Sequence, residues 1–292
     1  MKIDELQQLL VKHPQGAAMS QLINSGKVKH IFCGGLKASA SSVYASALIG
    51  NTHCPFVFIL GDLEEAGYFY HDLVQLLGDE QVLFFPSSFR RAIKFGQKDA
   101  ANEILRTEVL SRLEKNVANL FVVTYPDALA EKVIARQELD EKTIKIKIGD
   151  QLDMKFVTDL LQHYGFQYTD YVYEPGQYAQ RGSIIDVFSF SSEYPYRIDF
   201  FGDEVDSIRT FEIESQLSKD KKDSIVIVPD LSAGLSREGD GGMVSFLDFL
   251  QPETMVVMRD LFWLRERIQQ VHDEALTEQA KLAREAEEQG KL

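Results

Sequence analysis

The chain has 292 residues, of which 45% are hydrophobic and 26% charged, a balance typical of a folded globular protein and not of a disordered one. Lys and Arg together number 31 against 45 Asp and Glu, so the formal net charge is -14. This charge argues against broad nucleic-acid binding, because that affinity comes mainly from cations that meet phosphates.

Cysteine content and hydropathy indicate where the protein resides. Two cysteines, Cys33 and Cys54, are too few for a disulfide scaffold or a zinc cluster, so we expect a reducing compartment and no metal site. The first residues lack the apolar core of a signal peptide, and no stretch approaches about 18 apolar residues. The chain is therefore predicted to be cytoplasmic, without a membrane partner.

Residues 1–137 alternate between helical and strand patterns. Helices are predicted over residues 1–27, with a break at Pro14, and the spacing of Asp62 and Glu65 fits a capping box at the start of a later helix. Strands are predicted at 28–33, 55–60, 81–85 and 119–124, with helices at 38–49, from 62, at 99–114 and from Pro126. This alternation favours a parallel sheet covered by helices, an α/β domain.

The pattern changes near residue 140. Residues 142–148 alternate as a half-exposed strand does, and a helix around Phe156 ends before Gly165. Further strands are predicted at 168–173, 183–190, 196–201 and 205–213, the last two joined by a turn at 202–204. Residues 138–218 are therefore predicted to form an inserted α+β domain with an antiparallel sheet.

The remaining residues are predicted to return to the first domain. Residues 215–223 read as a polar linker, followed by strands at 224–228 and 253–258 with a flexible loop at 234–242 between them. A charged helix begins near Asp260 and shows no stop signal, so we expect the chain to be an N-terminal piece of a longer protein. The third segment of the predicted architecture is thus 219–292.

A glycine-rich turn follows the first predicted strand and has part of the pattern of a phosphate-binding P-loop. When the turn is compared with the P-loop pattern G-x-x-x-x-G-K-[ST], only the first position, Gly34, and the last, Ser41, fit. Ala40 stands at the position of the lysine that reaches the terminal phosphates, and alanine cannot replace it. The residues of this degenerate loop are Gly34, Gly35, Ser39, Ala40 and Ser41. We expect no nucleotide binding here, and we find no nucleophile–base arrangement, so no catalytic residue is predicted.

The strand at 196–201 has two different faces. By period 2, Tyr196, Ile198 and Phe200 share one face, and Arg197, Asp199 and Phe201 share the other. If the first face packs inward, the second exposes an arginine beside an aromatic ring, a combination enriched at binding hot spots, and Arg181 could join it. The alternative is that Phe201 lies in the core and Arg197 pairs with Asp199 or Glu204 on a solvated surface.

The same segment carries a family resemblance. The string EPGQYAQRGSIIDVFSF, followed by YPYRIDFFGDEVDSIRTF, closely resembles a stretch shared by the bacterial excinuclease B protein and the transcription-repair coupling factors (Mfd). In that family a first half-domain 1a precedes an inserted domain 2 and a returning domain 1b, which matches the order predicted above as 1–137, 138–218 and 219–292. Two departures make the chain more similar to the coupling factors than to the excinuclease B protein. The P-loop lysine is lost, and segment 84–99 is too short and has no tyrosine, whereas the excinuclease B protein has its DNA-clamping hairpin there.

The resemblance implies a function in nucleotide excision repair. It implies a docking module that recruits the excinuclease A protein through domain 2, with contact residues at the arginine of x-R-G, the arginine of P-Y-R and the second phenylalanine of D-F-F. These positions are Arg181, Arg197 and Phe201. It also implies no cofactor and no ATPase activity in this piece, whereas the full-length protein would have an ATP- and Mg-dependent DNA translocase motor and would contact RNA polymerase and DNA.

Two other functions remain open from the residues alone. The chain could be a fragment of a nucleotide-binding repair helicase or of the excinuclease B protein, with Lys37 replacing the missing lysine. It could also bind DNA directly through a basic cluster formed by Arg90, Arg91, Lys94 and Lys98, although the acidic total argues against this.

Overall fold

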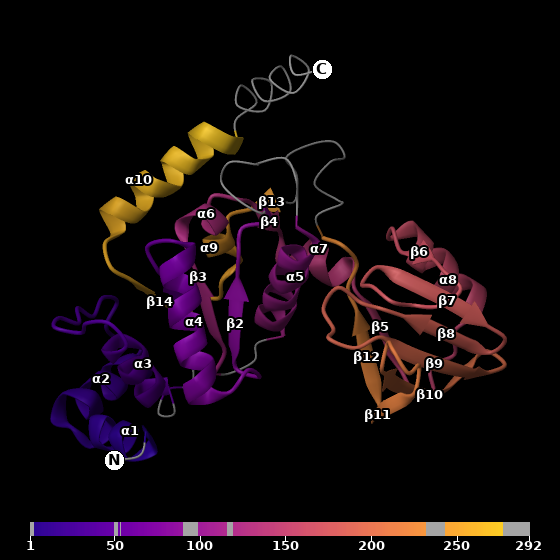
Figure 1. Ribbon diagram of the computed structural model, residues 1–292, viewed down its shortest axis with the longest axis horizontal. Coiled ribbons are helices and arrows are strands. Elements are labelled where there is room, and N and C mark those ends of the chain that lie inside the picture. The colour runs from indigo at the N-terminus through magenta and orange to yellow at the C-terminus, as the bar shows by residue number, and fades with distance from the viewer. Residues whose placement is uncertain are drawn as a thin grey trace. The chain divides into compact units, whose positions relative to one another are not determined.

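The computed structural model describes residues 3–49, 52, 54–89, 99–115, 119–231 and 243–276 (Figure 1). The chain divides into two compact units. The parallel-sheet unit comprises Met1–Gln97, Arg112–Val133 and Ser245–Leu292, and the antiparallel-sheet unit comprises Lys98–Ser111 and Ile134–Val244. Each unit is described by itself below.

The parallel-sheet unit is built on four parallel strands in the order β14-β1-β3-β2. Every residue of β1 and β3 is buried, as expected for parallel strands covered on both faces. Helix α4 packs against β2 and β3. The strands are β1 (Phe56–Ile59), β2 (Val82–Phe85), β3 (Phe121–Thr124) and β14 (Met255–Met258). The helices are α1 (Ile3–Lys12), α2 (Pro14–Ser25), α3 (Ala40–Ile49), α4 (Leu63–Leu77), α6 (Pro126–Leu129), α9 (Phe246–Phe249) and α10 (Leu261–Val271), followed by a π-helical turn (His272–Leu276).

Helix α4 begins where the sequence predicts. The Asp62 carboxylate accepts a hydrogen bond from the backbone N–H of Glu65 at 2.8 Å, satisfying one of the free donors of the first turn. The Glu65 carboxylate reaches back to the N–H of Gly61, also at 2.8 Å, one residue earlier than in the standard capping box. These two hydrogen bonds therefore fix the backbone between β1 and α4.

One predicted strand of this unit is wrong. Residues 28–33 form no strand, and Phe32 is 94% exposed. Their composition suits a strand, but a strand also needs a sheet edge to pair with, and the sheet is assembled from the other four predicted runs. The degenerate P-loop therefore follows an irregular, mostly exposed segment and not a buried strand.

The antiparallel-sheet unit contains a six-stranded sheet in the order β11-β10-β9-β8-β7-β6, antiparallel throughout except for the β6–β7 pair. Its strands are β6 (Gln167–Tyr168), β7 (Gln177–Arg181), β8 (Ile184–Val187), β9 (Tyr196–Phe201), β10 (Glu204–Phe211) and β11 (Ser218–Lys222). Two smaller pairs join β5 (Ile144–Lys147) to β12 (Ser224–Ile227) and β4 (Val133–Ile134) to β13 (Met243–Val244), and the division between the units falls within β4. The helices are α7 (Arg136–Glu141) and α8 (Met154–His163), and the division between the units passes through α5 (Ala100–Glu114).

One face of the six-stranded sheet forms the main core of this unit. Helix α8 contributes Val157 and Leu161, and β9 contributes Ile198 and Phe200, which are 0% and 4% exposed. A smaller cluster of Val172, Ala179, Phe188 and Phe211 is separate from this core. The α/β fold with one parallel and one antiparallel sheet is confirmed.

Three strands of this sheet differ from the sequence prediction. The strand predicted at 168–173 is β6, which ends at Tyr168. Residues 215–223, predicted as a polar linker, contain the edge strand β11, whose five residues are all exposed. A strand with no buried face shows no apolar alternation, so the backbone pairing with β10 leaves no signal in the sequence. Strand β7 was also not predicted. The predicted loop at 234–242 lies outside the described residues.

No helix in the described ranges combines the length and the apolarity needed to cross a membrane.

Candidate protein-docking site

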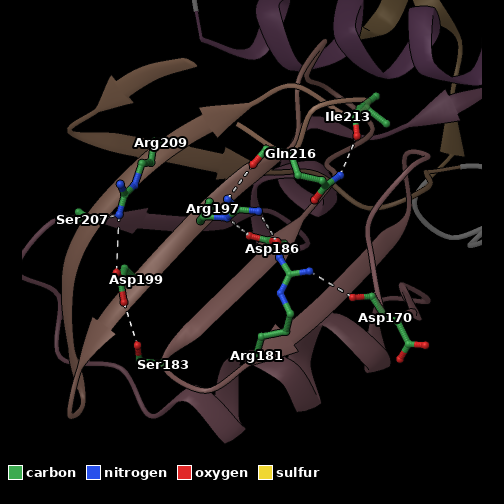
Figure 2. A network of polar contacts seen from close by, with 10 residues as sticks. All are labelled: Asp170, Arg181, Ser183, Asp186, Arg197, Asp199, Ser207, Arg209, Ile213 and Gln216. Atoms are coloured by element: carbon green, nitrogen blue, oxygen red, sulfur yellow. Dashed lines mark hydrogen bonds and ion pairs between the residues drawn. The ribbon is translucent and has the colours of Figure 1, made fainter. Parts of the chain in front are cut away.

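Three side chains on one face of the six-stranded sheet form a compact ionic cluster, called here the Asp186 cluster: Asp186 on β8, Arg197 on β9 and Arg181 on β7. Asp186 and Arg197 are direct cross-strand partners, and Asp186 lies opposite Ala179, two residues from Arg181. The Asp186 side chain is only 1% exposed. Figure 2 shows both guanidinium groups converging on its carboxylate.

Arg197 binds this carboxylate with both oxygens. Its Nε donates to Oδ1 of Asp186 at 2.7 Å and its Nη2 donates to Oδ2 at 2.9 Å, the bidentate geometry that makes arginine–carboxylate pairs strong. Its Nη1 donates to the carbonyl oxygen of Gln216 at 3.1 Å, and the guanidinium lies 4.4 Å from the ring centre of Phe211. The hydrogen bonds to Asp186 raise the pKa of Arg197 above its ordinary value, against the opposing effect of burial. With 14% of its side chain exposed, Arg197 is mostly enclosed.

Arg181 is held by fewer bonds and is more open. Its Nη2 donates to Oδ2 of Asp186, and its Nη1 donates to the carbonyl oxygen of Asp170 at 3.3 Å. The guanidinium also lies 4.8 Å from the ring centre of Tyr171, a cation–π distance. Its side chain is 36% exposed, so Arg181 combines a fixed position with access to solvent.

A second, looser pair lies on the same face. Arg209 on β10 approaches Asp199 on β9 at 3.6 Å, and Asp199 accepts a hydrogen bond from the hydroxyl of Ser183 at 3.0 Å (Figure 2). Both side chains of this pair are about a third exposed, 35% for Arg209 and 28% for Asp199. The three arginines and two aspartates of the two groups together carry one net positive charge.

Phe201 is the last residue of β9 and is 83% exposed. The hairpin turn beside it contains Gly202, whose φ of 64° is in the left-handed region that glycine adopts without strain. The face assignment is confirmed: Phe200 is buried, and Arg197 and Phe201 are on the opposite side. The structure brings Arg181 and Arg197 together through Asp186, and among the described residues Phe201 has no ring contact with either of them.

The alternative partners predicted for Arg197 were wrong. Asp199 pairs with Arg209, and Glu204 accepts a hydrogen bond from Gln151 at 3.1 Å. The sequence analysis did not predict the true partner of Arg197, Asp186, or the ring of Tyr171 that lies against Arg181. Asp186 is flanked by Ile185 and Val187, whose side chains are fully buried on the other face, and a lone acid in such an apolar run is the signal that could have found it.

The degenerate P-loop is found on the surface. Gly34, Gly35, Ser39 and Ala40 are exposed, and Ser41 is half-buried in the first turn of α3. The Ser41 hydroxyl donates to the carbonyl oxygen of Ala38 at 2.9 Å, so this hydroxyl is used within the loop itself. No group of three metal-ligating side chains occurs among the described residues. The predicted basic cluster of Arg90, Arg91, Lys94 and Lys98 lies outside them.

Comparison with known proteins agrees with this fold. The UvrB interaction domain matches residues 144–232, a range that includes the Asp186 cluster and Phe201. The transcription-repair-coupling factor of Bacillus subtilis (strain 168) is 29% identical over 235 residues, which are 77% of this chain and 20% of that protein. The corresponding factors of Escherichia coli (strain K12) and Haemophilus influenzae are 26% identical over 197 residues and 34% identical over 124 residues. These alignments cover 67% and 42% of this chain and 17% and 11% of the two factors.

These matches confirm the resemblance to the N-terminal module of the transcription-repair-coupling factors. The chain spans about a fifth or less of the length of these relatives.

Proposed function

We propose that this chain is a docking module that recruits the excinuclease A protein to stalled RNA polymerase during nucleotide excision repair. One observation carries the proposal: the UvrB interaction domain falls on the unit whose sheet exposes Phe201 and Arg181 on one face. The similarity to transcription-repair-coupling factors supports the connection to transcription and repair.

The chemistry of this face suits an acidic protein partner. Arginine and aromatic side chains dominate binding hot spots, because arginine pairs bidentately with carboxylates and a ring buries a large apolar area. Arg181 supplies a guanidinium fixed at one end, and the exposed ring of Phe201 supplies an apolar anchor. We therefore expect the partner to place a carboxylate beside Arg181 and an apolar pocket over Phe201.

The proposal is tested by measuring the affinity of the purified excinuclease A protein for this chain, by calorimetry or biolayer interferometry. Arg181→Ala, Arg197→Ala and Phe201→Ala should each weaken binding by about 2 kcal/mol, roughly 30-fold. Two variants of the same unit serve as controls that should bind normally: Phe156→Ala removes a ring that is 58% exposed on α8, and Lys145→Ala removes a cation that is 60% exposed on β5. Losses below about 0.5 kcal/mol at all three positions would refute the proposal.

We propose further that this chain uses no nucleotide and no metal, and that ATP and Mg act in the motor of the full-length protein together with its RNA polymerase and DNA contacts. The absent lysine of the loop and the internal bond of Ser41 support this. Titration with Mg-ATP should release no binding heat. Measurable magnesium-dependent binding would instead favour a nucleotide-binding repair enzyme, with Lys37 as the first residue to replace by Ala.

A further inference from the structure

The two arginines of the Asp186 cluster have unequal numbers of bonds. A guanidinium has five N–H donors. In Arg197 the Nε, Nη1 and Nη2 groups all have acceptors within the chain, and one face of the guanidinium lies over Phe211. In Arg181 only Nη1 and Nη2 are engaged, and within the described residues its Nε has no acceptor. Of its five donors Arg181 thus keeps three for a partner and Arg197 keeps two, and the Arg197 side chain is more enclosed, with 14% exposed against 36% for Arg181.

The carboxylate between them is unusual for a surface that meets an acidic partner. Asp186 is 1% exposed, and it cancels one of the positive charges that attract acidic groups. Simple attraction would be stronger without it. Its geometry offers a different benefit, since one buried carboxylate fixes two long and otherwise mobile side chains relative to the sheet.

We infer that Asp186 is a positioning residue of the docking face: together with Arg197 it holds the guanidinium of Arg181 in the orientation that binds a carboxylate of the partner. Arg181 makes the direct contact. Arg197 acts through Asp186, because its bidentate bond orients the carboxylate that Arg181 shares. The inference rests on the proposed docking function and assigns separate roles to residues that the family resemblance treats alike.

The surroundings of Arg181 support this division. Tyr171 lies under its guanidinium, and the carbonyl oxygen of Asp170 holds its Nη1, while the Asp170 carboxylate points away from it in Figure 2. The bonds to Asp170 and Asp186 use the two Nη groups of Arg181. Its Nε–H stays open, and together with an Nη–H it forms the edge that a carboxylate binds bidentately.

The decisive variant is Asp186→Asn, which keeps the shape of the side chain and adds one positive charge to the face. Binding of the excinuclease A protein should become about tenfold weaker, through faster dissociation, while association stays equal or becomes faster. Asp199→Asn is the matched control: it makes the same charge change on the same face, but Asp199 contacts Arg209 and Ser183 and not Arg181. This control should bind as tightly as the unaltered chain or more tightly.

A double-mutant cycle shows whether Asp186 acts through Arg181. In an Arg181→Ala background, Asp186→Asn should cost little further affinity, because the side chain that it positions is gone. Arg197→Lys tests the same point with the charge retained, and it should also weaken binding only when Arg181 is present. Equal losses with and without Arg181, unchanged or tighter binding by Asp186→Asn, or loss of fold in both Asp186→Asn and Arg197→Lys would each overturn the inference.

A measurement on the free chain separates this inference from the docking proposal. In NMR spectra, the Nη–H signal of Arg181 and the Nε–H signal of Arg197, which belong to groups that donate to Asp186, should exchange faster with water in Asp186→Asn than in Asp199→Asn. If these signals respond but Arg181→Ala and Phe201→Ala bind normally, the docking proposal fails while the positioning geometry stands. If the Arg181 signal is the same in both variants, Asp186 does not position it.

Discussion

The neighbouring residues Phe200 and Phe201 offer a direct test of how β9 is oriented. They carry identical side chains one position apart, so truncating each to alanine removes the same atoms from opposite faces of one strand. Phe200 is 4% exposed and belongs to the main core of the antiparallel-sheet unit, whereas Phe201 is 83% exposed. The two substitutions should therefore have very different effects on the free energy of unfolding.

The size of each effect follows from burial. Replacing a buried phenylalanine by alanine removes its transfer free energy and leaves a cavity, so Phe200→Ala should cost about 3–5 kcal/mol. Fully burying a phenylalanine contributes about 1.5–3 kcal/mol, and only about a sixth of Phe201 is buried, which gives roughly 0.3–0.5 kcal/mol. With a small loss of strand propensity, Phe201→Ala should cost less than about 1 kcal/mol.

Urea unfolding followed by far-ultraviolet circular dichroism measures both values, and amide hydrogen exchange of β9 and β10 assigns them to this sheet. The single tryptophan, Trp263, belongs to the parallel-sheet unit and its fluorescence does not report on β9. A difference between the two variants below about 1.5 kcal/mol would refute the assignment of Phe201 to the open face. It would also remove the structural basis for Phe201 as a docking anchor.

Three further predictions concern stability. Ser189→Ala should cost about 1–3 kcal/mol in urea unfolding, because the buried N–H of Val228 loses its acceptor at 2.9 Å; an unchanged midpoint would contradict this. Asp62→Ala should cost about 1 kcal/mol by removing the cap of α4, measured by thermal unfolding, and Asp62→Asn, which can still cap, should recover most of it. Burial raises the pKa of Tyr196 above its ordinary value near 10, so the unfolded chain loses this proton first and stability should fall as the pH rises above about 10. Tyr196→Phe should lessen that fall above about pH 10, and an identical fall would count against the shift.

Strand positions with a strong apolar pattern were predictable from local sequence. The runs that became β1, β2, β3 and β14 were all identified, since strands buried on both faces read as short continuous apolar segments. The same local rule failed at 28–33, where the segment has strand composition but no pairing partner in the sheet. The predicted domain boundaries at 137/138 and 218/219 stay predictions.

The docking face was predictable only in part. Period 2 along β9 places Arg197 and Phe201 on one face without any knowledge of the fold, because alternation is a property of each strand. Which acid Arg197 pairs with depends on the neighbouring strand and its register. Asp186 lies 11 positions earlier in the chain and becomes a neighbour only when β8 pairs with β9 at Asp186↔Arg197.

The amino-acid sequence by itself determined the order of α/β and antiparallel segments, the missing lysine of the phosphate loop and the two-faced strand with its arginine and ring. Tertiary structure alone decided that one buried carboxylate joins Arg181 to Arg197, that Arg181 stays open while Arg197 is enclosed, and that the polar segment at 218–222 is an edge strand. The reason is physical: side-chain alternation and helix caps depend on residues a few positions apart, whereas burial and ion pairing depend on the register between strands distant in sequence.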